Sequence, residues 1–184
     1  CVEDPLREEA ADAVRELKEA GITKVVMMTG DSERTAAAIA KRVGVDEYYS
    51  EVLPEDKASF VEKEKELGHK VIMIGDGIND SLALSSASVG IAISDGAAIA
   101  REIADVTISA DNLHEIVTLK RLSTALMKRI HNNYRTIIGI NGGLIALGVT
   151  GIIMPTTSAL LHNMSTLTIS LRSMRNLLPK EEEA

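Results

Sequence analysis

Aromatic side chains are nearly absent from this chain of 184 residues, which has no tryptophan, one phenylalanine and three tyrosines. The hydrophobic core must therefore be built from alanine, valine, isoleucine, leucine and methionine. A single cysteine, Cys1, excludes a disulfide framework and a cysteine-based zinc site within this chain. An initiating methionine and a signal peptide are also missing, and the opening CVEDPLREEA predicts a fragment of a longer protein.

Acidic residues are missing from one long stretch, because residues 116–180 carry 8 Lys/Arg and no Asp/Glu. Residues 1–115, in contrast, carry 12 Lys/Arg against 24 Asp/Glu, a balance of −12. Such a division predicts two environments: an acidic soluble part, and a basic part near a membrane surface or another polyanion.

Apolar segments alternate with amphipathic segments over the first 110 residues. Strands are predicted at 24–28, 71–74, 89–93 and 106–108, and helices at 7–20, 32–43, 54–67 and 96–103. The alternation predicts an α/β fold with a parallel sheet and helices on both of its faces.

Charged residues are missing from 137–154, which as a helix would span roughly 27 Å at about 1.5 Å per residue, close to the hydrocarbon thickness of a bilayer. A second uncharged stretch, 157–171, follows Pro155. A buried hairpin of a soluble protein is the alternative, but the basic flanks favour two membrane spans with both ends in the cytoplasm. The predicted parts are an α/β domain at 1–111, an amphipathic connecting helix at 112–135, a transmembrane hairpin at 136–172 and a cytoplasmic tail at 173–184.

Polar side chains follow two of the predicted strands, at the edge of the sheet where parallel strands bind ligands. They are Thr29, Gly30 and Asp31 after the first strand, and Asp76, Asn79 and Asp80 after the second. Two carboxylates beside an amide suit Mg²⁺, and Lys57, near the start of a predicted helix, suits a transferred phosphoryl group. Singly, Thr-Gly-Asp is a common turn and a lone lysine is usually exposed. Together and in this order, these residues predict a phosphoryl-transfer site.

Three stretches resemble the phosphorylation domain of P-type cation-transporting ATPases: MTGDSERTAAAIAKRVGV, LPEDK and VIMIGDGINDSLALSSASVGIAI. The resemblance covers essentially the whole chain and is strongest to the heavy-metal transporters, which end soon after a last pair of transmembrane helices. It implies a haloacid-dehalogenase-like (Rossmann-like) parallel sheet with helices on both faces, followed by a two-helix transmembrane hairpin. The parent would be an integral protein, expected in the plasma membrane.

The resemblance also implies roles for individual residues. Asp76 would coordinate Mg²⁺, and Asn79 and Asp80 would complete the network around metal and phosphate. Thr29 and Gly30 would hold the phosphoryl oxygens. The parent would hydrolyse ATP through an aspartyl-phosphate intermediate.

Two further residues complete the implied site. Lys57 would stabilise the phosphorylated state, and Asp31 would lie near the hinge to the nucleotide-binding domain. The Asp-Lys-Thr-Gly-Thr segment that accepts the phosphate is absent, as are the nucleotide-binding and actuator domains and the earlier transmembrane helices. All of these are expected upstream of Cys1, so the fragment alone should be inactive.

Two other functions are alternatives. A membrane-anchored phosphatase of the same superfamily would need an Asp-x-Asp motif after its first strand, and this chain has none there. A truncated membrane module without catalytic activity is the non-enzymatic alternative. A start codon at Cys1 would favour that module, whereas an upstream Asp-Lys-Thr-Gly-Thr would favour the transporter.

Polar residues inside the predicted spans are candidate ligands of the transported divalent or transition metal ion, namely Asn141, His162 and Asn163. Several heavy-metal ATPases have His-Glu-Gly-Gly-Thr where this chain has HNMST, so the carboxylate is lost and zinc, cobalt and manganese all stay open. Met164 leaves copper(I) open as well. Hydrogen bonding between helices is the alternative role for each of these residues. No nucleic-acid partner is expected.

Overall fold

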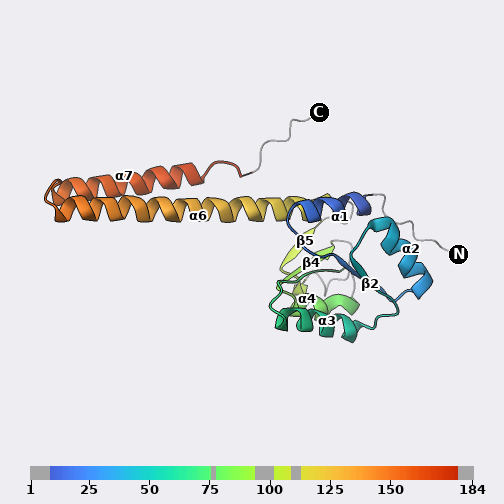
Figure 1. Cartoon of the computed structure of the whole chain (residues 1–184). Helices are drawn as coiled ribbons and strands as arrows, with labels where there is room; N and C mark the ends of the chain where they lie inside the picture. The colour runs from blue at the N-terminus through green and yellow to red at the C-terminus, as the bar shows by residue number, and fades with distance from the viewer. Residues whose placement is uncertain (1–8, 76–77, 94–101, 109–112, 178–184) are drawn as a thin grey trace, which may run out of the picture. The chain divides into compact units, whose positions relative to one another are not determined.

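The computed structural model describes residues 9–75, 78–93, 102–108 and 113–177, and the chain forms two compact units, Cys1–Leu119 and Lys120–Ala184 (Figure 1). Its elements are α1 (Ala10–Glu19), β1 (Val26–Met28), α2 (Glu33–Val43), β2 (Glu47–Tyr49), α3 (Pro54–Glu66), β3 (Ile72–Gly75), η1 (Ile78–Asp80), α4 (Ser81–Ser86), β4 (Val89–Ile93), β5 (Val106–Ile108), α6 (His114–Val149) and α7 (Pro155–Ser173). The first unit alternates strands and helices as predicted, and every strand pairing described is parallel.

The strands form two separate sheets. One contains β1 and β2, with Val26 opposite Glu47, and the other has the order β3–β4–β5, with Ile72 opposite Val89. Within the described part of the chain, β1 and β3 do not pair with each other. Each of them therefore keeps one edge without a strand partner.

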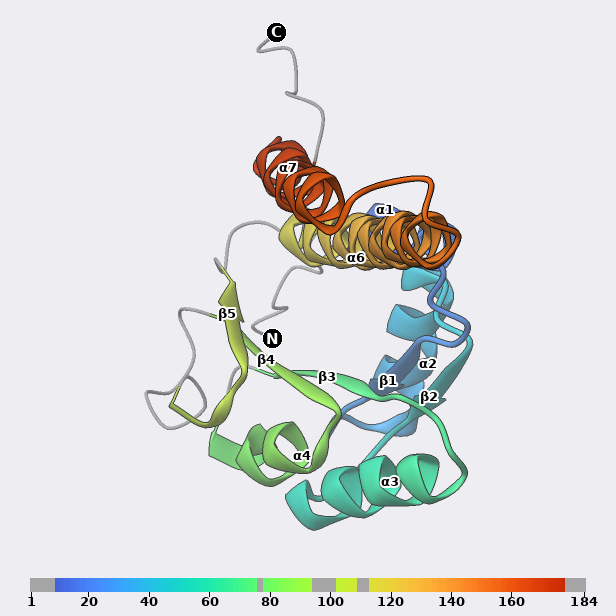
Figure 2. The same cartoon turned by 90° about the vertical axis from the view of Figure 1, so that its left-hand side faces the viewer.

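The three-stranded sheet lies between two helical layers, because its side chains alternate between two hydrophobic clusters. Ile91 of β4 packs with Ile108 and with Ile116 from the first turn of α6, and Leu17 of α1 joins this cluster. Its neighbour Ala92 points to the opposite face and packs against Leu84 of α4. Figure 2 shows α3 and α4 together on that second face.

Strand β2 and helix α4 were not predicted as separate elements. Strand β2 is exposed along its whole length and contains Glu47, Tyr48 and Tyr49, so it lacks the apolar pattern of the other strands. The predicted helix at 96–103 lies almost entirely outside the described residues.

Helix α6 ends at Val149, whereas the sequence predicted an uninterrupted apolar helix to residue 154. The N–H of Gly151 donates to Gly148 O and the N–H of Ile152 donates to Leu147 O, a hydrogen-bond pattern that ends a helix with a left-handed residue. Gly151 supplies that residue, with φ 74°. Over the described residues, none of the helices is both long enough and apolar enough to cross a bilayer.

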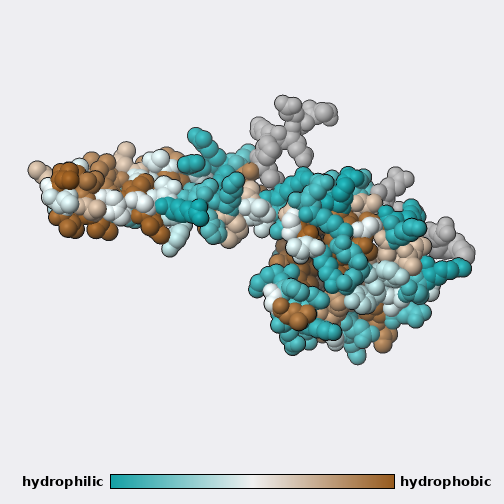
Figure 3. Space-filling view, viewed as in Figure 1, coloured by the Kyte–Doolittle hydropathy of each residue, from teal (hydrophilic) through white to brown (hydrophobic). Residues whose placement is uncertain are grey.

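Helices α6 and α7 lie side by side in the second unit, joined by the turn at 150–154 (Figure 1). Figure 3 shows hydrophobic residues gathered over the end of this hairpin that carries the turn. Val149 at that end is 84% exposed, and Ile152 and Met154 are also exposed. The apolar surface of this end is therefore not covered by the described residues.

Candidate functional site

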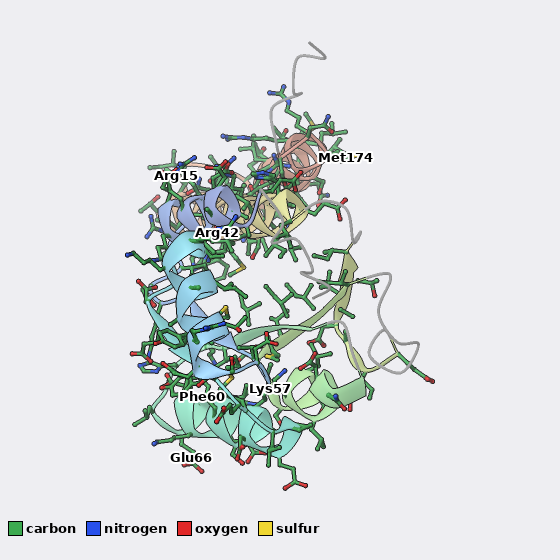
Figure 4. All side chains as sticks on the ribbon, turned by 90° about the vertical axis from the view of Figure 1, so that its right-hand side faces the viewer. Arg15, Arg42, Lys57, Phe60, Glu66 and Met174 are labelled. Atoms are coloured by element: carbon green, nitrogen blue, oxygen red, sulfur yellow. The ribbon has the colours of Figure 1, made fainter. Side chains whose placement is uncertain are left out.

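Lys57 and Asp80 form a direct ion pair beside the carboxyl end of β3. Helix α3 begins at Pro54, which suits the first turn of a helix, and the Asp56 carboxylate accepts a hydrogen bond from the N–H of Leu53. Lys57 follows in the same turn and points from α3 toward the strands (Figure 4). Its Nζ donates to Asp80 Oδ1 at 2.7 Å, and the side chains are only 16% and 10% exposed. This low exposure makes the contact stronger than a surface pair.

Gly75, the last residue of β3, makes room for Asp80. A Cβ atom at position 75 would lie 2.6 Å from Asp80 Cβ and 2.9 Å from Asp80 Oδ2. Such contacts are too close for any side chain, so only glycine allows the Asp80 carboxylate to rest against the end of the strand. Sequence reasoning did not identify this role of Gly75, although a glycine directly before a candidate metal ligand was a signal.

Thr29 and Asp31 hold each other in the turn that follows β1. Thr29 Oγ1 donates to Asp31 Oδ2 at 2.7 Å, and the backbone N–H of Asp31 donates back to Thr29 Oγ1 at 3.1 Å. Gly30 between them is exposed, with space above it, because an added Cβ would meet only Val52 O at 3.9 Å. The turn therefore presents an exposed backbone and a hydroxyl at the end of a parallel strand.

The segment after β2 fixes this turn through its backbone. The N–H of Val52 donates to Thr29 O at 3.0 Å, and the N–H of Glu51 donates to Asp31 O at 2.9 Å. Glu51 has φ 54°, which residues other than glycine rarely adopt. Because α3 starts directly after this segment, Lys57 is anchored to the turn containing Thr29. Sequence reasoning missed Glu51, and nothing in the local sequence signalled its conformation.

The structure brings some of the predicted site residues together and leaves others apart. Lys57 contacts Asp80, and Thr29 contacts Asp31, but no hydrogen bond joins the two pairs within the described part of the chain. Asn79 is exposed, and Asp76 lies outside the described residues. Among the residues described, no cluster of three or more His, Cys, Asp or Glu could hold a metal ion.

Hydrogen bonds near the start of α2 shift the pKa of one carboxyl group. Ser50 Oγ and Tyr48 Oη both donate to the Glu33 carboxylate, and these bonds lower the pKa of Glu33, with Ser50 as the larger cause. The bond to Glu33 in turn raises the pKa of Tyr48. Glu33 thus ties the end of β2 to the helix that follows the Thr29 turn.

In the second unit, His162 of α7 contacts Asn141 of α6. His162 Nδ1 lies 2.9 Å from Asn141 Oδ1. An amide oxygen only accepts hydrogen bonds, so Nδ1 is the donor in this contact, and in the neutral ring Nε2 is then the nitrogen with a free lone pair. Asn163 is exposed and makes no side-chain hydrogen bond to the described residues. The structure therefore joins two of the three candidate cargo ligands.

Known proteins similar to this chain agree with the α/β fold. Residues 1–88 match the haloacid dehalogenase-like hydrolase family. The chain is 37% identical over 173 residues to a zinc-exporting P-type ATPase of Mycobacterium marinum. The aligned region covers 94% of this chain and 24% of that protein. It is 38% identical over 173 residues to a manganese-exporting P-type ATPase of Mycobacterium tuberculosis, with the same two shares.

A solved structure is similar across both units of the chain. The crystal structure of a zinc-transporting PIB-type ATPase in an E2.Pi state matches with a TM-score of 0.87 and 34% identity. The match covers 96% of this chain and 28% of the ATPase chain. The chain spans about a quarter of the length of the relatives that it matches. It therefore has a haloacid-dehalogenase-like α/β fold and is homologous to one part of proteins that are named as heavy-metal-exporting P-type ATPases.

Proposed function

We propose that the chain is part of an ATP-driven heavy-metal cation transporter that forms an aspartyl-phosphate intermediate. The aspartate would lie upstream of Cys1, and this part would supply the Mg²⁺ and phosphate site and a portion of the ion path. The observation that carries the proposal is the Lys57–Asp80 pair at the carboxyl end of β3. It occurs in a chain whose relatives are named as exporters of zinc and manganese.

The side chains around Asp80 fit a magnesium ion. Asp80 Oδ1 is held by Lys57, and the carboxylate occupies space that Gly75 leaves open. By their place in the sequence, Asn79 would add an amide oxygen and Asp76 a second carboxylate, and Mg²⁺ prefers such hard oxygen ligands. We infer that Asp76, Asn79 and Asp80 hold the ion, which when bound would neutralise charge on the phosphoryl group.

The remaining residues of the first unit would act on the phosphoryl group directly. The backbone N–H of Gly30 would donate a hydrogen bond to its oxygens, and Thr29 Oγ1 would do so by turning its one hydroxyl proton from Asp31 to the phosphoryl group. The Lys57 ammonium has three donors, so it can keep its bond to Asp80 and still meet a phosphoryl oxygen. Positive charge held in place before the reaction stabilises the charge of the transition state. Asp31 would orient Thr29 and lie near the hinge to the nucleotide-binding domain.

The two separate sheets support an upstream nucleophile. One parallel strand added between β1 and β3 would join the sheets, and its carboxyl end would lie beside Thr29 and Asp80. An aspartate at the end of that strand would face both the hydroxyl and the cation. ATP would then be a substrate of the parent protein, bound by its nucleotide-binding domain.

We further propose that α6 and α7 form a transmembrane hairpin of the plasma membrane. The uncharged stretch 137–154 and the absence of acidic residues over 116–180 support this placement. Both ends of the hairpin and the phosphorylation domain would face the cytoplasm. His162 would be a ligand of the transported metal ion through Nε2, with Asn141 and Asn163 as further candidates.

The test uses the complete parent chain in nanodiscs, with ATPase activity measured in Mg²⁺ while Mn²⁺, Zn²⁺, Cd²⁺, Co²⁺ and Cu⁺ are titrated. We expect stimulation by one of these ions, a loss of activity of at least about 100-fold in Asp80→Asn, and loss of metal stimulation in His162→Ala. Asp12→Asn is the matched control, because Asp12 is exposed and pairs with Arg15 on its own helix. Activity that no metal changes would exclude a heavy-metal transporter.

A further inference from the structure

Arg129 of α6 holds the end of α7 through main-chain carbonyl groups. Its guanidinium donates to Ser173 O at 3.0 Å, to Asn176 O at 3.0 Å and to Arg175 O. One turn along α6, Asn133 Nδ2 donates to Ser173 Oγ at 2.7 Å, and Ser173 Oγ donates to Ile169 O at 2.8 Å. We call these contacts of Arg129 and Asn133 the α7 clamp.

The α7 clamp suits the chemistry of a helix end. The last carbonyl groups of a helix have no partner within the helix and carry partial negative charge. A guanidinium satisfies several of them at once because its five N–H donors are fixed in one plane. Lysine has three donors on one nitrogen, so it cannot present two separate nitrogens to carbonyl groups as Nη1 and Nη2 of Arg129 do.

Polar contacts between the two helices occur at two places along the described hairpin. One is the α7 clamp at Ser173, and the other is the hydrogen bond of His162 with Asn141. Hydroxyl groups between these places are bonded to their own helix, since Thr166 donates to His162 O and Thr168 donates to Met164 O. These hydroxyl groups therefore make no polar contact between the helices, so they do not fix the register of α7 on α6.

The spacing of the two places matches on both helices. At about 1.5 Å per residue, Asn141 lies about 18 Å along α6 from Arg129, and His162 lies about 17 Å along α7 from Ser173. Both contacts are therefore satisfied in the same register. A shift of α7 by one turn, about 5.4 Å, would break both.

We propose that Arg129 is a positioning residue that fixes the register of α7 on α6 and so holds His162 against Asn141. The bond to Asn141 sets the His162 tautomer and leaves Nε2 for a borderline divalent cation. This inference rests on the proposed function, because the cation is the cargo of that transporter. It assigns to Arg129 a role at a site that it does not touch.

The test compares Arg129→Gln with Lys128→Gln in the complete parent chain. Lys128 is the matched control, because it is the neighbouring basic residue and its exposed side chain makes no hydrogen bond to the described residues. We expect Arg129→Gln to raise the Zn²⁺ or Mn²⁺ concentration for half-maximal ATPase activity roughly ten-fold, with a smaller effect on kcat. Lys128→Gln should match the unmodified protein.

A second readout does not depend on metal or ATP. Asn141→Cys and His162→Cys are combined in a cysteine-free parent chain and treated with a short thiol crosslinker. Crosslinking should be efficient with Arg129 present and fall to background in Arg129→Gln. If Arg129→Gln is not recovered folded, Asn133→Ala removes the other half of the α7 clamp and should lower crosslinking to an intermediate yield.

Equal metal dependence and equal crosslinking in the Arg129, Asn133 and Lys128 variants would overturn the inference. Crosslinking that depends on Arg129 in a parent chain that no metal stimulates would instead overturn the proposed transport function. That result would leave the register role of Arg129 supported. The two proposals therefore fail in different measurements.

Discussion

Asp80 is placed by its neighbours as much as by its own backbone. Lys57 holds one carboxylate oxygen, and the missing side chain of Gly75 leaves the space that the carboxylate fills. A carboxylate that is 10% exposed needs such a partner, because an unpaired charge there would lose its hydration without compensation. Two residues from two other elements therefore determine where this candidate ligand lies.

Gly75→Ala should damage this arrangement. The new Cβ would lie 2.6 Å from Asp80 Cβ, so Asp80 must move and its contact with Lys57 must lengthen. We expect a loss of about 1–3 kcal/mol in the free energy of unfolding, measured by urea titration of the chain. In the parent chain, ATPase activity should fall as well.

Gly30→Ala is the stability control for Gly75→Ala. A Cβ at position 30 would meet Val52 O at 3.9 Å, which is an ordinary contact. Its free energy of unfolding should stay close to that of the unmodified chain. Equal stability of the two variants would show that Gly75 does not make room for Asp80.

The sequence predicted which residues belong to one site better than it predicted which residues contact one another in the fold. Lys57 and Asp80 were assigned to one site, and the structure joins them. The role of Gly75 was not predicted, because it depends on how a strand end and a later turn approach each other in space. The conformation of Glu51 depends on tertiary packing in the same way.

At the scale of elements, glycine was the most informative signal. Gly21 and Gly68 both have positive φ and end α1 and α3 where the sequence predicted. Gly151 ends α6 by the same hydrogen-bond pattern, yet it was interpreted as part of an apolar span. Because the stretch 137–154 is uncharged throughout, Gly151 was not interpreted as the end of a helix. The predicted helix was therefore longer than α6, which ends at Val149.

Asp46 connects α1, β1 and β2 through a single carboxylate. Its Oδ1 accepts from Lys18 Nζ at 2.7 Å, and its Oδ2 accepts from the N–H of Val25 at 2.8 Å. The bond from Lys18, followed by that from Val25, lowers the pKa of Asp46 below its ordinary value of 3.8. The folded chain therefore favours the ionised form.

Stability should depend on pH through this group. The pKa of Asp46 is lower in the folded chain than in the unfolded chain. Its contribution to the free energy of unfolding is therefore complete above the unfolded pKa of 3.8 and disappears as the pH falls through the folded pKa. We expect Asp46→Asn to be less stable than the unmodified chain at pH 7. Its urea midpoint should also fall less than that of the unmodified chain as the pH is lowered from 6 to 2. Asp12 is exposed on α1, and the urea midpoint of Asp12→Asn should fall with pH as steeply as that of the unmodified chain.

At the scale of the molecule, the chain forms two compact units, and most of its acidic residues lie in the first of them. The chemistry proposed here nevertheless needs residues that this chain does not contain. In the proposed site, Lys57 and Thr29 would stabilise a phosphoryl group and Asp80 would hold Mg²⁺, but the sequence has no Asp-Lys-Thr-Gly-Thr segment to accept the phosphate.

The purified chain should therefore not turn over ATP. With Mg²⁺ and ATP present, we expect no steady release of phosphate and no acid-stable labelling from γ-labelled ATP, while circular dichroism shows a folded protein. The parent chain, assayed alongside, should show both activities. Steady Mg²⁺-dependent turnover by the chain alone would contradict the proposed division of roles.

β1 and β3 each have an edge with no strand partner among the described residues, and this has a consequence for handling the chain on its own. Each edge presents a row of backbone N–H and C=O groups, which bind any extended peptide segment that approaches. A second copy of the chain can offer such a segment, as the strand proposed between β1 and β3 would. Intermolecular strand addition at these edges, and hence aggregation at high concentration, is the form of misassembly to which this chain is most exposed.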